Sequence, residues 1–305
     1  MRAKSDSTSA VFLATDQIRA TIEPLGASLV GLSFADNELM PAYDRVSAEG
    51  RYHGSVVAPW PNRIRDGRYS FSGVDYQLPI NEPARNNALH GLSATVPWSV
   101  VEVSGDTAHL ACRIGNVEGY PWPIGLEALY TLTGTAVVLE LQATNRSHGP
   151  APYGAAFHPY FGVPGVDRSQ YRLVSPASTV LIPDSHRLLP EGETSVEGGD
   201  FDFRDGDCPE RQLLDHAFTG FDEGSTAALI SPTGIRIEVQ GDSSNRWMQL
   251  HAPAGADHYG NCVVVEPMTC PPDAFNSNRD IIILQAGETR TLTWTITCGV
   301  AGASS

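Results

Sequence analysis

The feature that most restricts the fold is an alternation of large apolar and polar residues on two neighbouring segments. Leu126–Leu132 and Ala136–Thr144 both show it, and Thr133-Gly134-Thr135 joins them. A period of two places every second side chain on one face of an extended strand, and a short glycine turn lets two such strands pair. The same pattern recurs at Ala227–Ile230 with Ile235–Gln240, and at Tyr69–Phe71 with Tyr76–Leu78.

No stretch of the chain has the sustained 3.6-residue periodicity of an amphipathic helix. The 29 glycines and 22 prolines instead indicate many short strands and turns. We therefore predict one large all-β, antiparallel domain over residues 11–300. We expect flexible ends at 1–10 and 301–305, and a long loop from Asp184 to Asp207.

Charge and composition exclude several classes of protein. The net charge of −15, from 20 Lys and Arg against 35 Asp and Glu, argues against nucleic acid or an anionic membrane as a partner. Five scattered cysteines without a CxxC pair indicate neither a disulfide framework nor a zinc site. No apolar run approaches the roughly 18 residues of a membrane helix, and no signal peptide is evident. We expect a cytoplasmic protein.

The segment Val263–Asn276 is the strongest candidate for a catalytic segment. Three β-branched residues, Val263 to Val265, predict a buried strand, and Glu266 and Pro267 follow at once. Because proline has no N–H for a sheet ladder, we expect the strand to end there and hold the Glu266 carboxylate at its tip. A general base needs such a fixed, partly desolvated position; the alternative is a solvated glutamate at a strand end.

Arg63 and His90 are candidates for ligand binding. Arg63 follows a proline-stiffened turn, so its guanidinium group could be held toward a cleft to bind vicinal hydroxyls; the alternative is a surface salt bridge. His90 precedes Gly91 in a turn, which leaves room for a ligand to approach; the alternative is a histidine that caps backbone groups.

His158 and Asp215 are two further candidates. His158 lies among small residues and aromatics in the segment 152–161, which suggests an imidazole at the edge of a tightly packed site; a core histidine is the alternative. Asp215 precedes His216 and could orient an imidazole or bind hydroxyls, although such pairs are common. The chain has no GxSxG, P-loop, GxGxxG or HExxH motif, so a Ser/His/Asp hydrolase has no support in the sequence.

The order of these motifs resembles the aldose 1-epimerase (galactose mutarotase) family. The motifs are NRI, DGRY, YQLPIN, NALHG, FHPYF, LDHAF and VEPMTCPPDAFN, and the similarity extends from about Ile18 to Thr297. The resemblance implies a single large antiparallel β-sandwich, the galactose mutarotase-like supersandwich, with a sugar in an open cleft. It further implies that Glu266 is the general base, that His158 is the general acid, and that Arg63, His90 and Asp215 bind sugar hydroxyls.

This assignment agrees with the chemistry of anomer exchange. Opening a hemiacetal ring requires a base for the C1 hydroxyl and an acid for the ring oxygen, and requires no metal or organic cofactor. We expect Glu266 and His158 to face each other across the cleft. We also expect a bell-shaped pH dependence, falling in acid as Glu266 gains a proton and in base as His158 loses one.

Three departures from the family pattern point to a divergent branch. The chain has Trp60-Pro61 before Asn-Arg, Phe157-His158-Pro159 where Asn-His-Ser is usual, and Glu266-Pro267-Met268 where Glu-Thr-Gln is usual. We expect all three to line the cleft and to affect the choice of substrate more than the chemistry.

The preferred substrate is a free aldohexose, galactose or glucose, and two alternatives stay open. A hexose-6-phosphate mutarotase would need extra cations at the rim, for which Arg65, Arg68, Arg85 and Arg187 are available. A sugar-binding module without catalysis is the other, but binding alone would not require both Glu266 and His158. We expect a monomer or weak homodimer.

Overall fold

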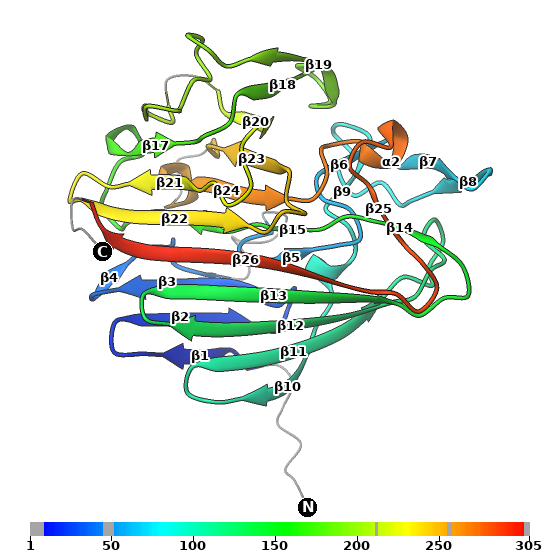
Figure 1. Cartoon of the computed structure of the whole chain (residues 1–305), viewed down its shortest axis with the longest axis horizontal. Helices are drawn as coiled ribbons and strands as arrows, with labels where there is room; N and C mark the ends of the chain where they lie inside the picture. The colour runs from blue at the N-terminus through cyan, green and yellow to red at the C-terminus, as the bar shows by residue number, and fades with distance from the viewer. Residues whose placement is uncertain (1–8, 45–51, 211–212, 255–257, 302–305) are drawn as a thin grey trace, which may run out of the picture.

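The computed structural model describes residues 9–44, 52–210, 213–254 and 258–301. Within these ranges the chain is almost entirely antiparallel β-structure, dominated by two eight-stranded sheets (Figure 1). The all-β prediction is therefore confirmed. The predicted flexible ends, 1–10 and 301–305, fall almost entirely outside the described residues.

The first large sheet is built on the predicted hairpins and crosses the middle of Figure 1. β12 and β13 pair along their whole lengths, and β26 pairs with the other edge of β13. Buried and more exposed residues alternate along all three strands because one face packs on the core. In spatial order the strands are β10 (Ser99–Val103), β11 (Thr107–Ile114), β12 (Ile124–Thr133), β13 (Ala136–Asn145), β26 (Thr289–Val300), β22 (Ile235–Gly241), β21 (Ala227–Ile230) and β17 (Arg172–Val174).

The second large sheet carries the catalytic candidates. Its central strand β24 is buried on both faces, unlike the outer strands of the first sheet. In spatial order the strands are β19 (Pro190–Ser195), β18 (Thr179–Pro183), β20 (Asp215–Thr219), β23 (Trp247–His251), β24 (Val263–Met268), β15 (Ala156–Phe157) and β5 (Val56–Val57), with β16 (Tyr160–Phe161) also paired to β24.

Smaller elements complete the described chain. A four-stranded sheet contains β1 (Val11–Ala14), β2 (Ile18–Glu23), β3 (Ser28–Phe34) and β4 (Asn37–Glu38). Three two-stranded sheets are β6 (Arg63–Arg65) with β9 (Asn87–Leu89), β7 (Arg68–Phe71) with β8 (Val74–Gln77), and β14 (Ala151–Tyr153) with β25 (Ile282–Leu284). The helical segments are η1 (Ser93–Thr95), η2 (Arg168–Gln170), η3 (His258–Asn261) and α2 (Ala274–Ser277).

Aromatic side chains join the sheets into one core. The ring of Phe157, from the second sheet, lies 6.1 Å from Trp294 and 6.5 Å from Tyr130, both from the first sheet. The Tyr130 hydroxyl donates a hydrogen bond to the carbonyl of Ala27 beside β3, at 2.7 Å. The layers therefore pack face to face, which is the sandwich arrangement that the sequence predicted.

The predicted hairpins are confirmed, but the long loop is only partly correct. β7 and β8 meet at a two-residue turn of Ser72 and Gly73, both with positive φ, as a tight hairpin requires. The segment from Asp184 to Asp207, in contrast, contains β19, which pairs with β18. Its residues are largely exposed, so the strand lacks the apolar alternation that would have revealed it.

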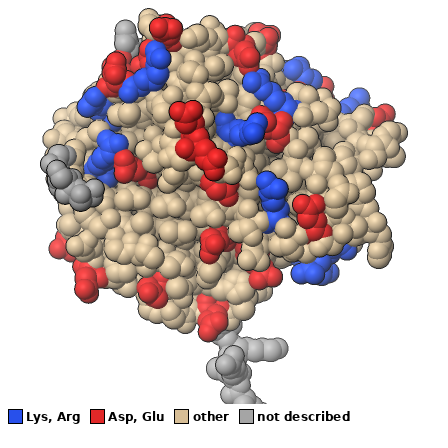
Figure 2. Space-filling model, viewed as in Figure 1, with Lys and Arg blue, Asp and Glu red and all other residues tan. Residues whose placement is uncertain are grey.

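The surface in Figure 2 fits the acidic composition. Acidic side chains are spread over this face, whereas basic ones gather in its upper and right-hand parts and are interspersed with acidic ones. This face therefore offers no continuous basic surface for a polyanion. None of the helices in the described parts of the chain has the length and apolar character needed to cross a membrane.

Candidate active site

Glu266 lies within β24 rather than at its end. The strand continues through Pro267 to Met268, and Glu266 pairs with Gln249 of β23, so the predicted strand end is wrong. On the other edge, β15 pairs with β24 at Met268 and β16 pairs with it at Val264. Continuing the register from Ala156 and Met268 places Pro267 opposite Phe157, the last residue of β15, so the proline lies where regular pairing on this edge is interrupted before β16 begins.

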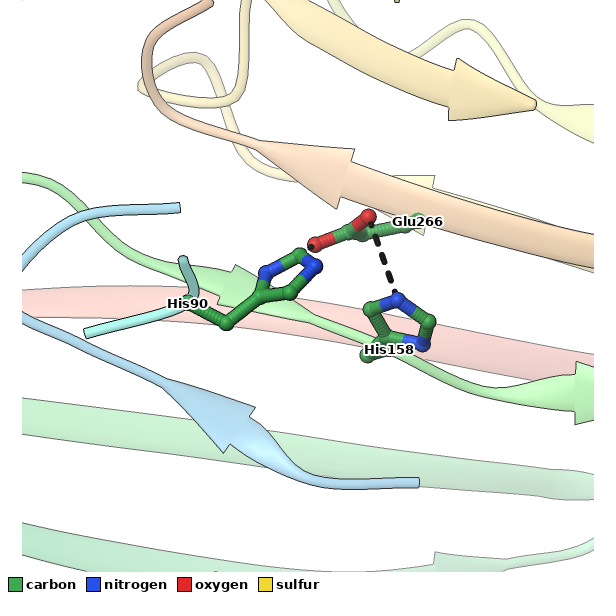
Figure 3. Close-up of side chains that lie close together, drawn as sticks. All are labelled: His90, His158 and Glu266. Atoms are coloured by element: carbon green, nitrogen blue, oxygen red, sulfur yellow. Dashed lines mark ion pairs between the residues drawn. The ribbon is translucent and has the colours of Figure 1, made fainter. Parts of the chain in front are cut away.

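His158 lies in this interval between β15 and β16. Continuing the register of the two strands through the interval places His158 directly opposite Glu266. Opposite residues of an antiparallel pair project from the same face of the sheet. Accordingly, Nε2 of His158 lies 3.7 Å from Oε2 of Glu266, although the residues are 108 positions apart (Figure 3).

The two groups are neighbours on one wall of the site. A separation of 3.7 Å leaves no room for a sugar ring between them. The expectation that they face each other across the cleft is therefore wrong in its geometry. Both side chains reach the same point from adjacent strands, and a substrate must meet them from one side.

The next row of the same sheet contributes Asp215. His251 of β23 pairs with Val264 on one edge and with Asp215 of β20 on the other, so the row shares the face of Glu266. Gln249 Nε2 donates to Asp215 Oδ1 at 2.7 Å, and His251 Nδ1 lies 3.6 Å from the same oxygen. Asp215 is thereby held with its second oxygen available to a ligand.

His90 is fixed by reciprocal hydrogen bonds with Asn62. The N–H of His90 donates to the carbonyl of Asn62 at 2.9 Å, and the N–H of Asn62 donates to Nδ1 of His90 at 3.2 Å. Because Nδ1 accepts this bond, the ring proton must sit on Nε2. His90 is therefore a neutral donor, and its Nδ1 lies 3.9 Å from Glu266 Oε1 (Figure 3).

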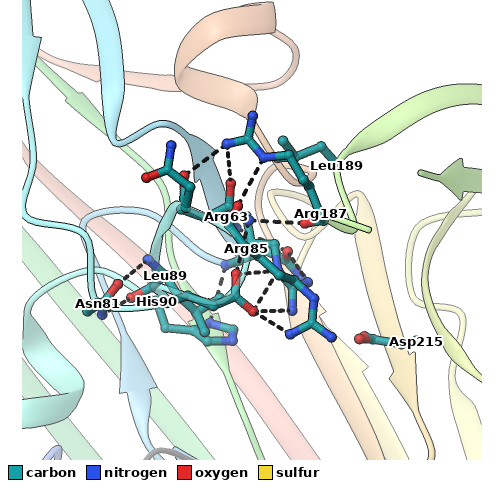
Figure 4. A network of polar contacts seen from close by, with 12 residues as sticks. Arg63, Asn81, Arg85, Leu89, His90, Arg187, Leu189 and Asp215 are labelled. Carbon is teal, nitrogen blue, oxygen red and sulfur yellow. Dashed lines mark hydrogen bonds and ion pairs between the residues drawn. The ribbon is translucent and has the colours of Figure 1, made fainter. Parts of the chain in front are cut away.

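Arg63, at the start of β6, is held by Glu82. Its Nε and Nη2 each donate to a carboxylate oxygen of Glu82 at 3.0 Å, the bidentate geometry that suits a guanidinium group (Figure 4). Nη1 of Arg63 donates to Asn62 Oδ1 at 3.3 Å. Arg63 is therefore not a surface arginine but a buried one, 8% exposed, with a defined orientation.

These side chains line one pocket of about 270 Å³, which is small for a ligand site. All five residues predicted for the site are among its lining residues. The complete lining is Tyr52, Asn62, Arg63, Glu82, Arg85, Leu89, His90, His158, Tyr160, Asp215, Gln249, His251 and Glu266.

The environment of the central pair opposes charge. Burial raises the pKa of Glu266 well above its usual value; the Asp215 carboxylate raises it further and Arg63 lowers it. Burial lowers the pKa of His158 to about 4. Both oxygens of Glu266 and Nδ1 of His158 have no hydrogen-bond partner among the described residues. The pocket therefore favours a neutral carboxyl group beside a neutral imidazole.

The surrounding groups have different protonation preferences. Burial lowers the pKa of His90 well below its usual value, in agreement with its fixed tautomer. Burial raises the pKa of Asp215, but His251, Arg63 and the hydrogen bond from Gln249 together outweigh it, so the pKa is lowered. Asp215 is thus an ionised carboxylate beside the central pair, whereas Glu266 is the protonatable one.

The three departures from the family pattern do not line this pocket, so that expectation is wrong. Trp60 packs against Tyr120 and Phe275, and Phe157 points into the core between the large sheets. Pro267 lines a separate pocket. The physical reason for Phe157 and Pro267 is strand alternation, because the neighbours of His158 and Glu266 face away from the site.

Among the arginines considered for phosphate binding, Arg85 lines the pocket, where it pairs with Glu82 at 3.0 Å. Arg65, Arg68 and Arg187 are not among the lining residues, and their side chains pair with Asp273, Gln77 and Asp66 respectively.

Several pocket residues escaped the sequence analysis. Gln249 and His251 alternate within the apolar segment 247–252, and polar residues on one face of a buried strand are a detectable signal. Tyr52, whose ring lies 4.6 Å from that of His90, and Glu82 come from irregular segments without a local signal.

His90, His158 and Glu266 also bring metal-ligand atoms within 4.8 Å of one another. A metal ion that used Nδ1 of His90 would have to displace the hydrogen bond from the Asn62 N–H.

Comparison with known proteins decides the family. The sequence profile of the family described as "Aldose 1-epimerase" matches residues 10–297. The chain belongs to this family. Relatives include the uncharacterized Escherichia coli K12 protein YihR, 31% identical over 94% of this chain and 92% of its own, and galactose mutarotase from Mus musculus, 29% identical over 78% and 73%. This family member is thus an isomerase, a sugar mutarotase.

Solved structures share the fold of this epimerase. The GalM/aldose epimerase homologue from C. elegans superposes with a TM-score of 0.86 at 21% identity, covering 96% of this chain and 100% of its own. Galactose 1-epimerase from Lactobacillus acidophilus NCFM superposes with a TM-score of 0.81 at 19% identity, covering 96% and 94%. The supersandwich fold is thereby confirmed.

The opposite pKa shifts of two pocket glutamates predict opposite effects on stability. A raised pKa means that folded Glu266 keeps a proton that the unfolded chain has lost, so stability falls as pH rises above about 4.5. Burial raises the pKa of Glu82, but Arg63, Asn87 and Arg85 outweigh it, so Glu82 contributes stability that is lost as pH falls through its lowered pKa.

As pH rises from about 5 to about 8, we therefore expect the melting temperature of Glu266→Gln to increase relative to that of the wild type, whereas that of Glu82→Gln stays below the wild type throughout. Thermal unfolding of the three proteins across this range measures both effects. If Glu266→Gln kept the same pH dependence as the wild type, the raised pKa would be wrong.

Proposed function

We propose that this enzyme interconverts the α and β anomers of a free aldohexose, galactose or glucose. The observation that carries the proposal is the Glu266–His158 pair, two buried proton-transfer groups 3.7 Å apart with unpartnered atoms. Buried polar atoms without partners are rare in folded proteins and call for a ligand or water that satisfies them. Sugar hydroxyls can both donate to and accept from these groups.

In the proposed reaction Glu266 is the base and His158 the acid, as the family resemblance implies. Glu266 takes the proton of the C1 hydroxyl while the bond between C1 and the ring oxygen breaks. The ring oxygen keeps the electron pair of that bond and takes a proton from His158. The open aldehyde then rotates about C1–C2, and closure runs the same transfers backwards to give the other anomer.

The reactive form of the Glu266–His158 pair holds one titratable proton, shared between the carboxyl group and the imidazole. The reaction starts from ionised Glu266 beside protonated His158, and this form carries the same number of protons as the neutral carboxyl group beside the neutral imidazole. A bound sugar that donates hydroxyl hydrogens to Glu266 would stabilise the ionised form, because hydrogen bonds to a carboxylate lower its pKa. Substrate binding therefore helps to prepare the acid and the base.

Four polar groups around the pair are suited to hold the sugar. Arg63 and Nε2 of His90 are donors, and the ionised Asp215 is an acceptor for hydroxyl groups. Gln249 has its carbonyl oxygen buried and without a hydrogen-bond partner among the described residues, so it can accept one as well. Fixed donors and acceptors of this kind orient the ring for proton transfer.

The charges of the pocket favour an unphosphorylated sugar. Its two arginines, Arg63 and Arg85, both already pair with Glu82, whose charge offsets one of the two. Asp215 adds a negative charge close to the reacting pair. A phosphate dianion would be repelled by this carboxylate and would have to break existing ion pairs.

Replacing the base tests the mechanism. Glu266→Gln keeps the shape of the side chain but cannot accept a proton, so we expect kcat to fall by about 10²- to 10⁴-fold while sugar binding largely persists. Polarimetry on freshly dissolved α-D-glucose and α-D-galactose measures the rate against the uncatalysed background. Normal turnover by the variant would require another base.

The pH profile tests the protonation states. We expect a bell-shaped kcat/KM whose acid limb reflects protonation of His158, with a pKa of about 4, and whose alkaline limb reflects loss of the proton from Glu266. This reverses the assignment expected from the sequence, because burial inverts the order of the two pKa values. The limbs belong to the coupled pair, so residual activity of His158→Gln, which still needs ionised Glu266, should lose the alkaline limb and instead rise with pH through the raised pKa of Glu266. An unchanged acid limb in that variant would contradict the assignment.

The choice of sugar is tested by direct competition. We expect a higher kcat/KM for glucose or galactose than for glucose 6-phosphate, with little dependence on salt. Measuring all three substrates at low and high ionic strength separates the possibilities. A preference for the phosphorylated sugar that weakens as salt rises would show that the arginines act as a phosphate clamp.

A further inference from the structure

Glu82 occupies the point where the two arginines of the pocket meet. Its Oε1 accepts from Arg63 Nη2 and Arg85 Nη1, each at 3.0 Å, and its Oε2 accepts from Arg63 Nε and Asn87 Nδ2, each at 3.0 Å. An ionised carboxylate offers about four acceptor sites, so protein donors fill all of them. Glu82 lines the pocket but has no acceptor capacity left for a sugar.

We propose that Glu82 is a positioning residue, which aims the sugar-binding guanidinium group of Arg63 and compensates its charge. This inference rests on the proposed function. The bidentate pair uses the Nε–Nη2 edge of Arg63, so the guanidinium plane is fixed and Nη1, beside Asn62, is the group turned to other partners. A guanidinium group held in this way loses little freedom when a hydroxyl binds to it.

The segment that carries Glu82 is itself held at several points (Figure 4). Asn81 accepts from the N–H of Leu89 at 2.7 Å and donates to its carbonyl at 2.9 Å. Arg187, from the turn between β18 and β19, donates to the carbonyls of Arg85 and Asn86, each at 2.9 Å. The second large sheet and the β6–β9 sheet are thereby joined behind Glu82, which makes it a rigid support.

The charge of Arg63 reaches the reacting groups as well. It lowers the pKa of Glu266, of Asp215 and of His90. Three charged or titratable groups face Glu82: Arg63, Arg85 and Tyr52. Four such groups surround Glu266: Asp215, Arg63, His90 and His158. His251 lies next to Asp215. Without Glu82 the charge of Arg63 is less compensated, and Glu266 loses its proton at a lower pH.

A double-mutant cycle with Glu82→Gln, Arg63→Gln and both together tests the proposal. For Glu82→Gln we expect KM to rise about 10- to 100-fold, the loss expected when one charge-assisted hydrogen bond is misaligned. We also expect kcat to change much less and the alkaline limb of the pH profile to move to lower pH. In the Arg63→Gln background, Glu82→Gln should change neither KM nor the position of the alkaline limb of the pH profile.

The control is Glu193→Gln, which removes a carboxylate from an exposed ion pair with Arg279 and should leave KM and the alkaline limb unchanged. Equal effects of Glu82→Gln in both backgrounds, or an alkaline limb that stays in place, would overturn the proposal and leave Glu82 a structural residue. If Glu82→Gln alone does not fold, comparing KM and the alkaline limb of the double variant with those of Arg63→Gln still decides whether Glu82 acts through Arg63. Wild-type protein that fails to speed mutarotation would instead reject the proposed function.

Discussion

The antiparallel register around β24 is the constraint on which the site depends. It places His158, Gln249 and Glu266 in one row, and Asp215 and His251 in the next. The break between β15 and β16 is part of this arrangement, because it leaves His158 outside regular pairing yet opposite Glu266. A shift of one residue in the register of β24 would point the Glu266 side chain into the core.

Burial shifts the pKa values of Glu266 and His158 and lowers the stability of the fold. Glu266 and His158 lie in a sheet whose other face is the main core, so water does not solvate their charges. Their pKa values move in opposite directions and their polar atoms lack partners among the described residues. A site with unsatisfied groups is less stable than a satisfied one, but it is ready for a ligand that supplies hydroxyl groups.

Sequence patterns predicted the strands best where one face is buried. The β12–β13 hairpin and the alternation of Leu292, Trp294 and Ile296 were read correctly, since each residue there faces either core or solvent. β19 was missed because its side chains are largely exposed. The prediction from Pro267 was wrong, since β24 continues through the proline by pairing with β23 while its pairing on the other edge is interrupted between β15 and β16. The order of the motifs predicted five site residues, and all five line one pocket in the structure. Glu82 and Tyr52 line the same pocket, but no sequence pattern around them indicated a site.

The sequence by itself determined the fold class, the family and the kinds of groups available for proton transfer, because these follow from local alternation and motif order. Tertiary structure alone decided that Glu266 and His158 are adjacent rather than opposed, that burial inverts their usual order of pKa values, and that Arg63 pairs with Glu82. The physical reason is that distance and desolvation depend on strands that are far apart in the chain and meet only when the sheets pack.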